Sequence, residues 1–283
     1  MSTSVRVGTE STATLGGRRE TLISRIARQT GRMGLLFPAV ALMAVFLIGP
    51  IAYSVYGSLT NAALSGYKAA NPEFVGLENY AELLTSNAFW KAVLLTVIFV
   101  FASAVVGQNV LGLALAMLMR KAPKILSTLV GGVVVIAWVM PEIVAAFALY
   151  AFFSTDGTLN VLLSYIGLGG TTWLLTFPMF SVIMANIWRG TAFSMMVYSA
   201  ALAEVPPEIQ EAAKVDGARG SQRFFFVTLP MIKGSISTNL LLTTLQTLGV
   251  FTLLWVMTGG GPGTQSTTLP VMAYQEAFKN SLI

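Results

Sequence analysis

Five long apolar segments constrain the fold of this chain more than any other feature. They cover about residues 34–58, 91–119, 126–152, 176–202 and 233–257. A helix of about 20 apolar residues crosses a hydrocarbon core of about 30 Å, and within lipid every backbone N–H and C=O needs a partner in the chain. Only 10% of the residues are charged, whereas soluble domains carry about 25%. The sequence therefore predicts an all-α integral membrane protein with five visible spans.

The basic residues indicate which ends of the spans face the cytoplasm. Most of the 17 Lys and Arg residues lie before the first span, between the second and third, or between the fourth and fifth. Only Lys68, Lys91 and Lys279 lie in the other connections. Because Lys and Arg concentrate in cytoplasmic connections, the N-terminus is expected to be cytoplasmic. The same placement accounts for the net charge of +5, so nucleic-acid binding is not expected.

The chain is expected to divide into a tail and one membrane domain. Residues 1–32 are rich in Ser, Thr, Gly and Arg, which predicts a basic cytoplasmic tail that is mostly mobile. Residues 33–283 are expected to form a single transmembrane domain with a cytoplasmic loop over 203–232. There is no Cys and no His, which excludes disulfides, thiolate chemistry and imidazole ligands or bases. Neither a catalytic residue nor a metal site is expected.

Small residues in the second span recur at four-residue spacing. The pairs are Ser103 with Gly107 and Gly112 with Ala116. Such pairs let another helix approach closely when lipid supplies no hydrophobic driving force. The general abundance of Gly and Ala in membrane helices explains them equally well.

The loop over 203–232 contains the pattern of two short helices. Prolines open the first, acidic residues lie near its positive end, and Gly217 ends it. One narrow face carries small and apolar side chains followed by a carboxylate, namely Ile209, Ala212, Ala213 and Asp216. Gly217 can adopt a positive φ and reverse the chain into the second helix, for which Ser221 is the expected N-cap. Taken alone, an inert connection and a docking loop remain equally open.

The loop also matches a specific signature. Glu211-Ala212-Ala213 is followed after three residues by Gly217, and after nine more by Val227, one residue and Leu229-Pro230. This resembles the coupling-loop signature of permease subunits of binding-protein-dependent ABC importers, in which isoleucine is more usual at the position of Val227. Four stretches resemble the carbohydrate branch, the relatives of the maltose and glycerol-3-phosphate permeases: Asp216–Ala218, Val205-Pro206, Phe74–Tyr80 and Thr258–Pro262.

The resemblance implies a fold, a location and a set of partners. The fold would be a type I ABC importer transmembrane domain, with a sixth span expected beyond residue 283, in the cytoplasmic (inner) membrane of a bacterium or archaeon. The subunit would form half of a translocation pathway with a second homologous permease. An extracytoplasmic sugar-binding protein would deliver a carbohydrate, and an ATPase subunit dimer would bind ATP and Mg. This chain lacks a G-x-x-x-x-G-K-[ST] motif, so it is expected to hold no cofactor and to catalyse no reaction.

Two groups of candidate residues follow. In the family resemblance, the residues that transmit ATPase motion are Glu211, Ala212, Ala213, Asp216 and Gly217. For the substrate path the candidates are polar or aromatic residues within spans, namely Trp138, Glu142, Tyr150, Trp188 and Arg189. Glu142 and Arg189 could equally pair with each other or cap kinked helices, and the aromatic residues could serve in packing or as interface anchors.

Two other function classes remain as alternatives. A stand-alone secondary transporter or channel would need ion-coupling carboxylates within spans, and only Glu142 fits that role. An intramembrane hydrolase would have little to build on beyond a Ser–Lys pair. The sequence does not identify which sugar or polyol is carried.

Overall fold

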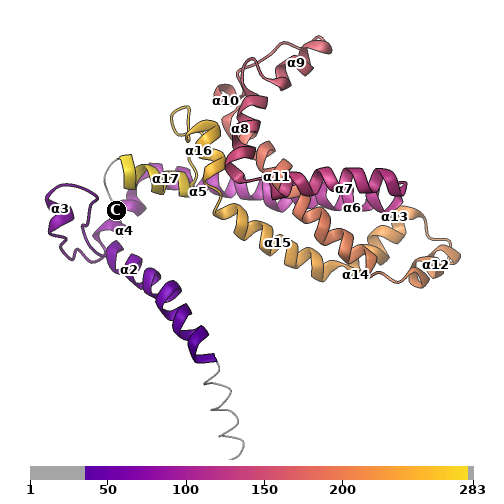
Figure 1. Ribbon diagram of the computed structural model, residues 1–283, viewed down its shortest axis with the longest axis horizontal. Coiled ribbons are helices and arrows are strands. Elements are labelled where there is room, and N and C mark those ends of the chain that lie inside the picture. The colour runs from indigo at the N-terminus through magenta and orange to yellow at the C-terminus, as the bar shows by residue number, and fades with distance from the viewer. Residues whose placement is uncertain (1–35, 280–283) are drawn as a thin grey trace, which may run out of the picture. The chain divides into compact units, whose positions relative to one another are not determined.

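The computed structural model describes residues 36–279 (Figure 1), and within this range it contains helices and connections without a β-strand. An antiparallel bridge joins Thr60 to Phe74. The predicted tail, residues 1–32, lies outside the described residues. The chain divides into two compact units, Met1–Leu59 and Thr60–Ile283. The all-α class expected from the sequence is confirmed.

In the first unit, the described part is a helix over Leu36–Ser58, close to the span predicted at 34–58. It contains the π-helical segment η1 (Ala44–Ile48) and α2 (Gly49–Ser58). Pro50 lies two residues beyond the end of η1, so the widened turn directly precedes a residue that cannot donate a backbone hydrogen bond.

The second unit begins with α3 (Tyr67–Ala70) and α4 (Glu78–Thr85). A continuous helix of 35 residues follows, composed of α5 (Asn87–Val100), η2 (Phe101–Gln108) and α6 (Asn109–Lys121). At 1.5 Å per residue it is about 50 Å long, so it extends beyond a hydrocarbon core of about 30 Å. α7 (Lys124–Val139) packs beside α6 after a two-residue connection, and so short a link makes the two helices an antiparallel hairpin.

The expectation of one continuous third span over 126–152 is wrong. α7 ends at Val139, and α8 (Glu142–Phe153) begins after Met140 and Pro141. Proline lacks an N–H and disfavours helical geometry at the preceding residue, and Met140 accordingly has ψ of 132°. The short helices α9 (Thr158–Tyr165) and α10 (Trp173–Thr176) follow.

The predicted fifth span, 233–257, is also interrupted. α15 (Lys233–Leu248) ends at Gly249, and α16 (Thr252–Thr258) begins three residues later. α16 packs on α8, and the chain then continues through a glycine-rich turn into α17 (Leu269–Tyr274) and η4 (Gln275–Lys279).

By length and composition, three segments of the described chain could cross a membrane: Leu36–Ser58, Asn87–Lys121 and Glu142–Tyr165. A fourth qualifies if Gly220–Met231 and Lys233–Leu248, which meet at 69°, are taken together. The 26-residue helix α11 (Pro178–Ala203), near the predicted fourth span, is not among them. Many polar side chains of α11 are buried against neighbouring helices, and these lower its apolar content.

α6 and η2 pack closely against α11 (Figure 1). A Cβ atom added to Gly107 would overlap with Ile187, and one added to Gly112 would overlap with Ser194. From the α11 side, a Cβ on Gly190 would overlap with the Gln108 side chain. Of the two interpretations of the small residues, the structure favours close helix approach, since a Cβ at Gly112 would also meet the backbone of α11.

Candidate coupling loop and intramembrane charge pair

The predicted coupling loop begins with α12 (Pro207–Val215). This helix ends in a Schellman motif, in which the Gly217 N–H donates to the Lys214 carbonyl at 3.1 Å and the Ala218 N–H donates to the Ala213 carbonyl at 3.0 Å. Gly217 has φ of 81°, as expected of the residue that reverses the chain. No atom lies within 4 Å of a Cβ built there, so its requirement for glycine is conformational rather than steric.

The predicted coupling residues lie on an accessible part of this loop. They are Glu211, Ala212, Ala213, Asp216 and Gly217, of which only Ala213 is half-buried while the others are exposed. Val215 adds an apolar side chain that is 87% exposed, and Ile209 is 42% exposed. The loop therefore presents small, apolar and acidic groups that the rest of the described chain leaves uncovered.

The second short helix is α13 (Gly220–Arg223), and it continues into η3 (Phe224–Thr228). The expected N-cap at Ser221 is wrong. Arg219 occupies the N-cap position, and its backbone N–H donates to Oε1 of Gln222 at 2.8 Å. The helix therefore begins before Ser221, which is its second residue, and the Gln222 side chain satisfies the backbone donor of the N-cap residue.

A hydrogen bond connects α12 to η3. Gln210 Nε2 donates to Oγ1 of the buried Thr228 at 2.8 Å, and that hydroxyl donates to the Arg223 carbonyl at 3.3 Å. Beyond Thr228, α14 (Leu229–Met231) meets α15 at Ile232 with a bend of 69°. α12 is thereby linked through η3 to the first turn of α15.

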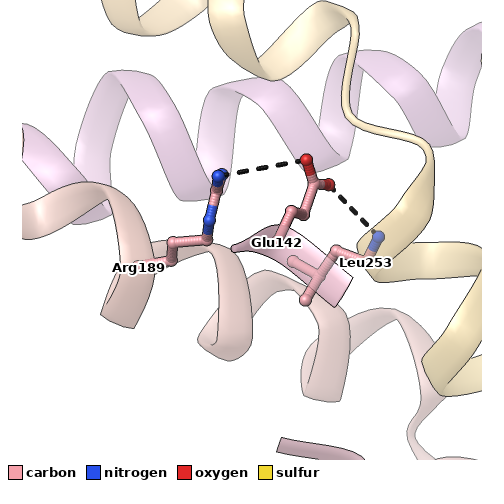
Figure 2. Close-up of polar contacts among 3 residues, drawn as sticks. All are labelled: Glu142, Arg189 and Leu253. Atoms are coloured by element: carbon pink, nitrogen blue, oxygen red, sulfur yellow. Dashed lines mark hydrogen bonds and ion pairs between the residues drawn. The ribbon is translucent and has the colours of Figure 1, made fainter. Parts of the chain in front are cut away.

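Glu142 and Arg189 meet where α8, α11 and α16 converge. The guanidinium Nη2 of Arg189 lies 3.9 Å from Oε2 of Glu142, while Oε1 of Glu142 accepts the Leu253 N–H at 3.3 Å. Both contacts are drawn in Figure 2. Leu253 lies in the first turn of α16, where backbone N–H groups lack helical partners and the helix dipole favours an anion. Both structural roles considered from the sequence, pairing and capping, are therefore present at Glu142. The two side chains keep about 30% exposure, so the pair is only partly withdrawn from solvent.

The aromatic candidates do not gather into one site. Trp138 stacks on Phe193 with ring centroids 5.9 Å apart, which is the packing role, although it remains 40% exposed. Trp188 and Tyr150 are each 46% exposed. Tyr150 lines a separate cavity of about 460 Å³ together with Thr172 and the end of α16.

A buried polar network between α6, α11 and α15 was missed by sequence reasoning. The Tyr198 hydroxyl donates to Oδ1 of Asn109, and Nδ2 of Asn239 donates to the same oxygen at 2.8 Å. Asn239 also donates to the Ser194 hydroxyl at 2.9 Å, and Asn109 donates to Thr243 at 3.4 Å. A search for ionisable and aromatic residues overlooks such neutral groups. The signal that could have found them is the four-residue spacing of Asn239, Thr243 and Thr247 on one face of α15.

Comparison with known proteins gives a family match over most of the second unit. The family described as "Binding-protein-dependent transport system inner membrane component" matches residues 108–281. The trehalose/maltose transport system permease protein MalF of Thermococcus litoralis is 31% identical over 258 residues, covering 89% of this chain and 86% of that protein. The sulfoquinovosyl glycerol transport system permease protein SmoG of Agrobacterium fabrum is 33% identical over 249 residues, covering 85% of this chain and 78% of that protein. SugA, the trehalose transport system permease protein of Mycobacterium tuberculosis, is 33% identical and covers 90% of this chain and 81% of its own length.

Solved structures show the same fold. A bacterial ABC transporter involved in import of the acidic polysaccharide alginate superposes with a TM-score of 0.74 at 24% identity, over 92% of this chain and 88% of that one. The alginate ABC transporter in complex with an alginate pentasaccharide-bound periplasmic protein gives 0.73 at 23% identity, over 92% and 87%.

Proposed function

The chain belongs to the family of binding-protein-dependent transport system inner membrane components, and from that premise we propose that it forms half of the translocation pathway of an ATP-driven carbohydrate importer. Permease subunits of this family are non-catalytic, and ATP is hydrolysed by a separate subunit. In this proposal that subunit is a dimer that binds ATP and Mg²⁺. The relatives named as permeases for trehalose, maltose and sulfoquinovosyl glycerol support a carbohydrate as the substrate class. The family membership leaves the stand-alone secondary transporter without support.

The coupling role of the loop over 203–232 rests on one structural observation. α12 exposes its predicted contact residues, yet it is tied by the Gln210–Thr228 hydrogen bond to the segment that continues into α15. A partner that moves α12 therefore also moves the start of α15. In this proposal Ala212 and Ala213 form the close contact with a cleft on the ATPase. Glu211 and Asp216 supply charged contacts, and Gly217 reverses the chain at the end of α12.

The orientation in the membrane and the remaining partners follow from the same proposal. The loop and the N-terminus face the cytoplasm of a bacterium or archaeon, with the basic residues beside them. A second homologous permease completes the pathway, and an extracytoplasmic binding protein delivers the sugar. The periplasmic protein in the alginate transporter complex supports an arrangement of this kind.

For the substrate path, the geometry divides the five candidates by role. Glu142 and Arg189 are proposed to fix the wall of the pathway, since both are held between helices. Trp138, Tyr150 and Trp188 keep between 40% and 46% of their surface exposed, and these are proposed as the side chains that stack on sugar rings.

The experiment that tests the coupling role is site-specific cross-linking. The natural chain has no Cys, so Ala212→Cys introduces a unique thiol on the proposed contact face, which can carry a short photo-cross-linker in cells that express the neighbouring transport genes. Ser221→Cys, exposed on α13 outside that face, is the matched control. We expect an ATPase adduct from the 212 position at several times the yield of the control. Equal yields, or an adduct from neither position in a correctly inserted protein, would reject the coupling role.

A further inference from the structure

A cavity of about 330 Å³ lies between the end of α6 and the coupling loop. Its polar lining consists of three cations, Arg120, Lys121 and Arg223, together with Gln210 and Thr228. The other side chains that line it are apolar, and none is acidic. The cavity is therefore a concentration of positive charge with apolar walls.

The positive charge in this cavity is not compensated within residues 36–279. The recorded ion pair of that range joins Arg189 to Glu142, and no carboxylate pairs with Arg120, Lys121 or Arg223. Nε of Arg223 is shielded from solvent and has no hydrogen-bond acceptor. A shielded guanidinium donor costs free energy unless an anion or another acceptor reaches it.

We propose that this cavity binds the phosphate group of an anionic phospholipid. Two guanidinium groups and an ammonium suit a phosphate, which accepts paired N–H donors from arginine. The cavity lies at the end of the long apolar helix that α6 completes, beside the end of α11, and basic pockets between membrane helices on the cytoplasmic side bind anionic headgroups. Phe225 and Phe226, which follow in η3, are 59% and 78% exposed, as befits side chains at a membrane interface.

A free phosphate offers the same chemistry, but the walls favour a lipid. Met117, Leu202 and Phe224 supply apolar surface next to the cations, which suits a glycerol backbone and the start of an acyl chain. A bound headgroup would connect α6 to α13 and η3 beside the Gln210–Thr228 hydrogen bond. It would thereby hold the coupling loop against the second span. The cytoplasmic placement and this regulatory consequence rest on the proposed function, whereas the binding itself does not.

The test measures lipid retention by the full chain in nanodiscs that contain phosphatidylcholine with or without phosphatidylglycerol. The pocket variant is Arg120→Gln with Arg223→Gln. Its control is Lys124→Gln with Arg219→Gln, which removes the same charge from the same connections but from residues outside the cavity lining. Bound phosphatidylglycerol is counted by native mass spectrometry, and binding of inorganic phosphate is measured separately by calorimetry.

We expect the wild type and the control to retain phosphatidylglycerol and the pocket variant to bind it about 25-fold more weakly, because each cation near a headgroup contributes about fivefold. Arg223→Lys keeps the charge but removes the shielded Nε donor, so intermediate retention is expected. Binding of inorganic phosphate with the same variant dependence, but without lipid retention, would keep the phosphate site and overturn the lipid as its occupant. Equal retention by the pocket variant and the control would overturn the site. Because no ATPase is present, these outcomes are independent of whether the coupling proposal holds.

Discussion

Removal of the Glu142 carboxylate tests whether the charge pair organises the junction of α8, α11 and α16. Glu142→Gln keeps an oxygen that can accept the Leu253 N–H but removes the charge that faces Arg189, whereas Glu142→Ala removes both interactions. Arg189→Gln removes the other half of the ion pair alone. The three changes together separate the capping interaction from the ion pair.

The distances in the structure set the magnitudes. Unit charges 3.9 Å apart interact by about 4 kcal/mol at an effective dielectric constant of about 20. Desolvation of the ions and residual access of water reduce the net value, and we expect about 1–2 kcal/mol from the pair. The 3.3 Å hydrogen bond to Leu253 adds about 1 kcal/mol. Glu142→Gln and Arg189→Gln should therefore each cost about 1–2 kcal/mol, and Glu142→Ala about 2–3 kcal/mol.

Denaturant titration in mixed micelles measures the free energy of unfolding. It is applied to the single variants and to the double variant that carries Glu142→Gln and Arg189→Gln. Since the two changes remove one shared interaction, the double variant should be less destabilised than the sum by about 1 kcal/mol. Glu82→Gln, at an exposed position on α4, is the control and should change stability by less than about 0.5 kcal/mol. Additive effects within about 0.5 kcal/mol would refute the ion pair, and equal costs of Glu142→Gln and Glu142→Ala would refute the capping role.

Three further substitutions test the loop and the helix packing. Gly217→Ala places a residue with a Cβ at φ of 81°, which should destabilise the end of α12 by about 1 kcal/mol. We expect reduced sugar uptake at an unchanged amount of protein in the membrane. Uptake equal to that of the wild type would contradict the role of the Schellman motif. Gly112→Ala should lower the unfolding free energy by about 1–3 kcal/mol because the added Cβ overlaps with Ser194. The control Gly131→Ala has open space around it and should be neutral or stabilising. Equal effects of the two changes would contradict the close packing. Thr228→Val removes the acceptor of Gln210 and should reduce the transport rate per ATP hydrolysed in proteoliposomes; an unchanged ratio would show that the hydrogen bond does not transmit motion.

The apolar segments predicted where the chain is helical, because backbone satisfaction in lipid leaves few alternatives. They did not predict continuity. The break at Met140–Pro141 was visible as a proline, but a proline inside a membrane helix can also be tolerated as a kink. The break after Gly249 had a weaker signal, since glycine is common in such helices. There the Glu142 carboxylate accepts the Leu253 N–H near the new helix start, and that partner lies 111 residues away in the sequence.

The candidate coupling loop could be predicted in more detail than the membrane interior. Its helix, its glycine stop and its exposed face depend on local rules, and the structure has all three. The N-cap expected at Ser221 is wrong because the helix already begins at Gly220, where the Gln222 side chain accepts from the Arg219 backbone N–H. Within the membrane, the partners of Asn109 and Asn239 come from other helices, and no local rule identifies them.

The buried polar residues of α11 explain why this helix is not apolar enough to count as a membrane span. The end of α11 is also where the loop over 203–232 begins. Asn186, Ser194 and Tyr198 of α11 are paired with η2, α15 and α6 respectively. Buried polar side chains are thus part of the packing between α11 and its neighbours. The loop over 203–232 leaves the end of α11 and returns at the start of α15, and Val205 and Ile232, at these two ends, belong to one buried apolar cluster. In the proposed coupling, a force on α12 would therefore act on α11 and α15 together, and α6 is in close contact with α11 at Gly112.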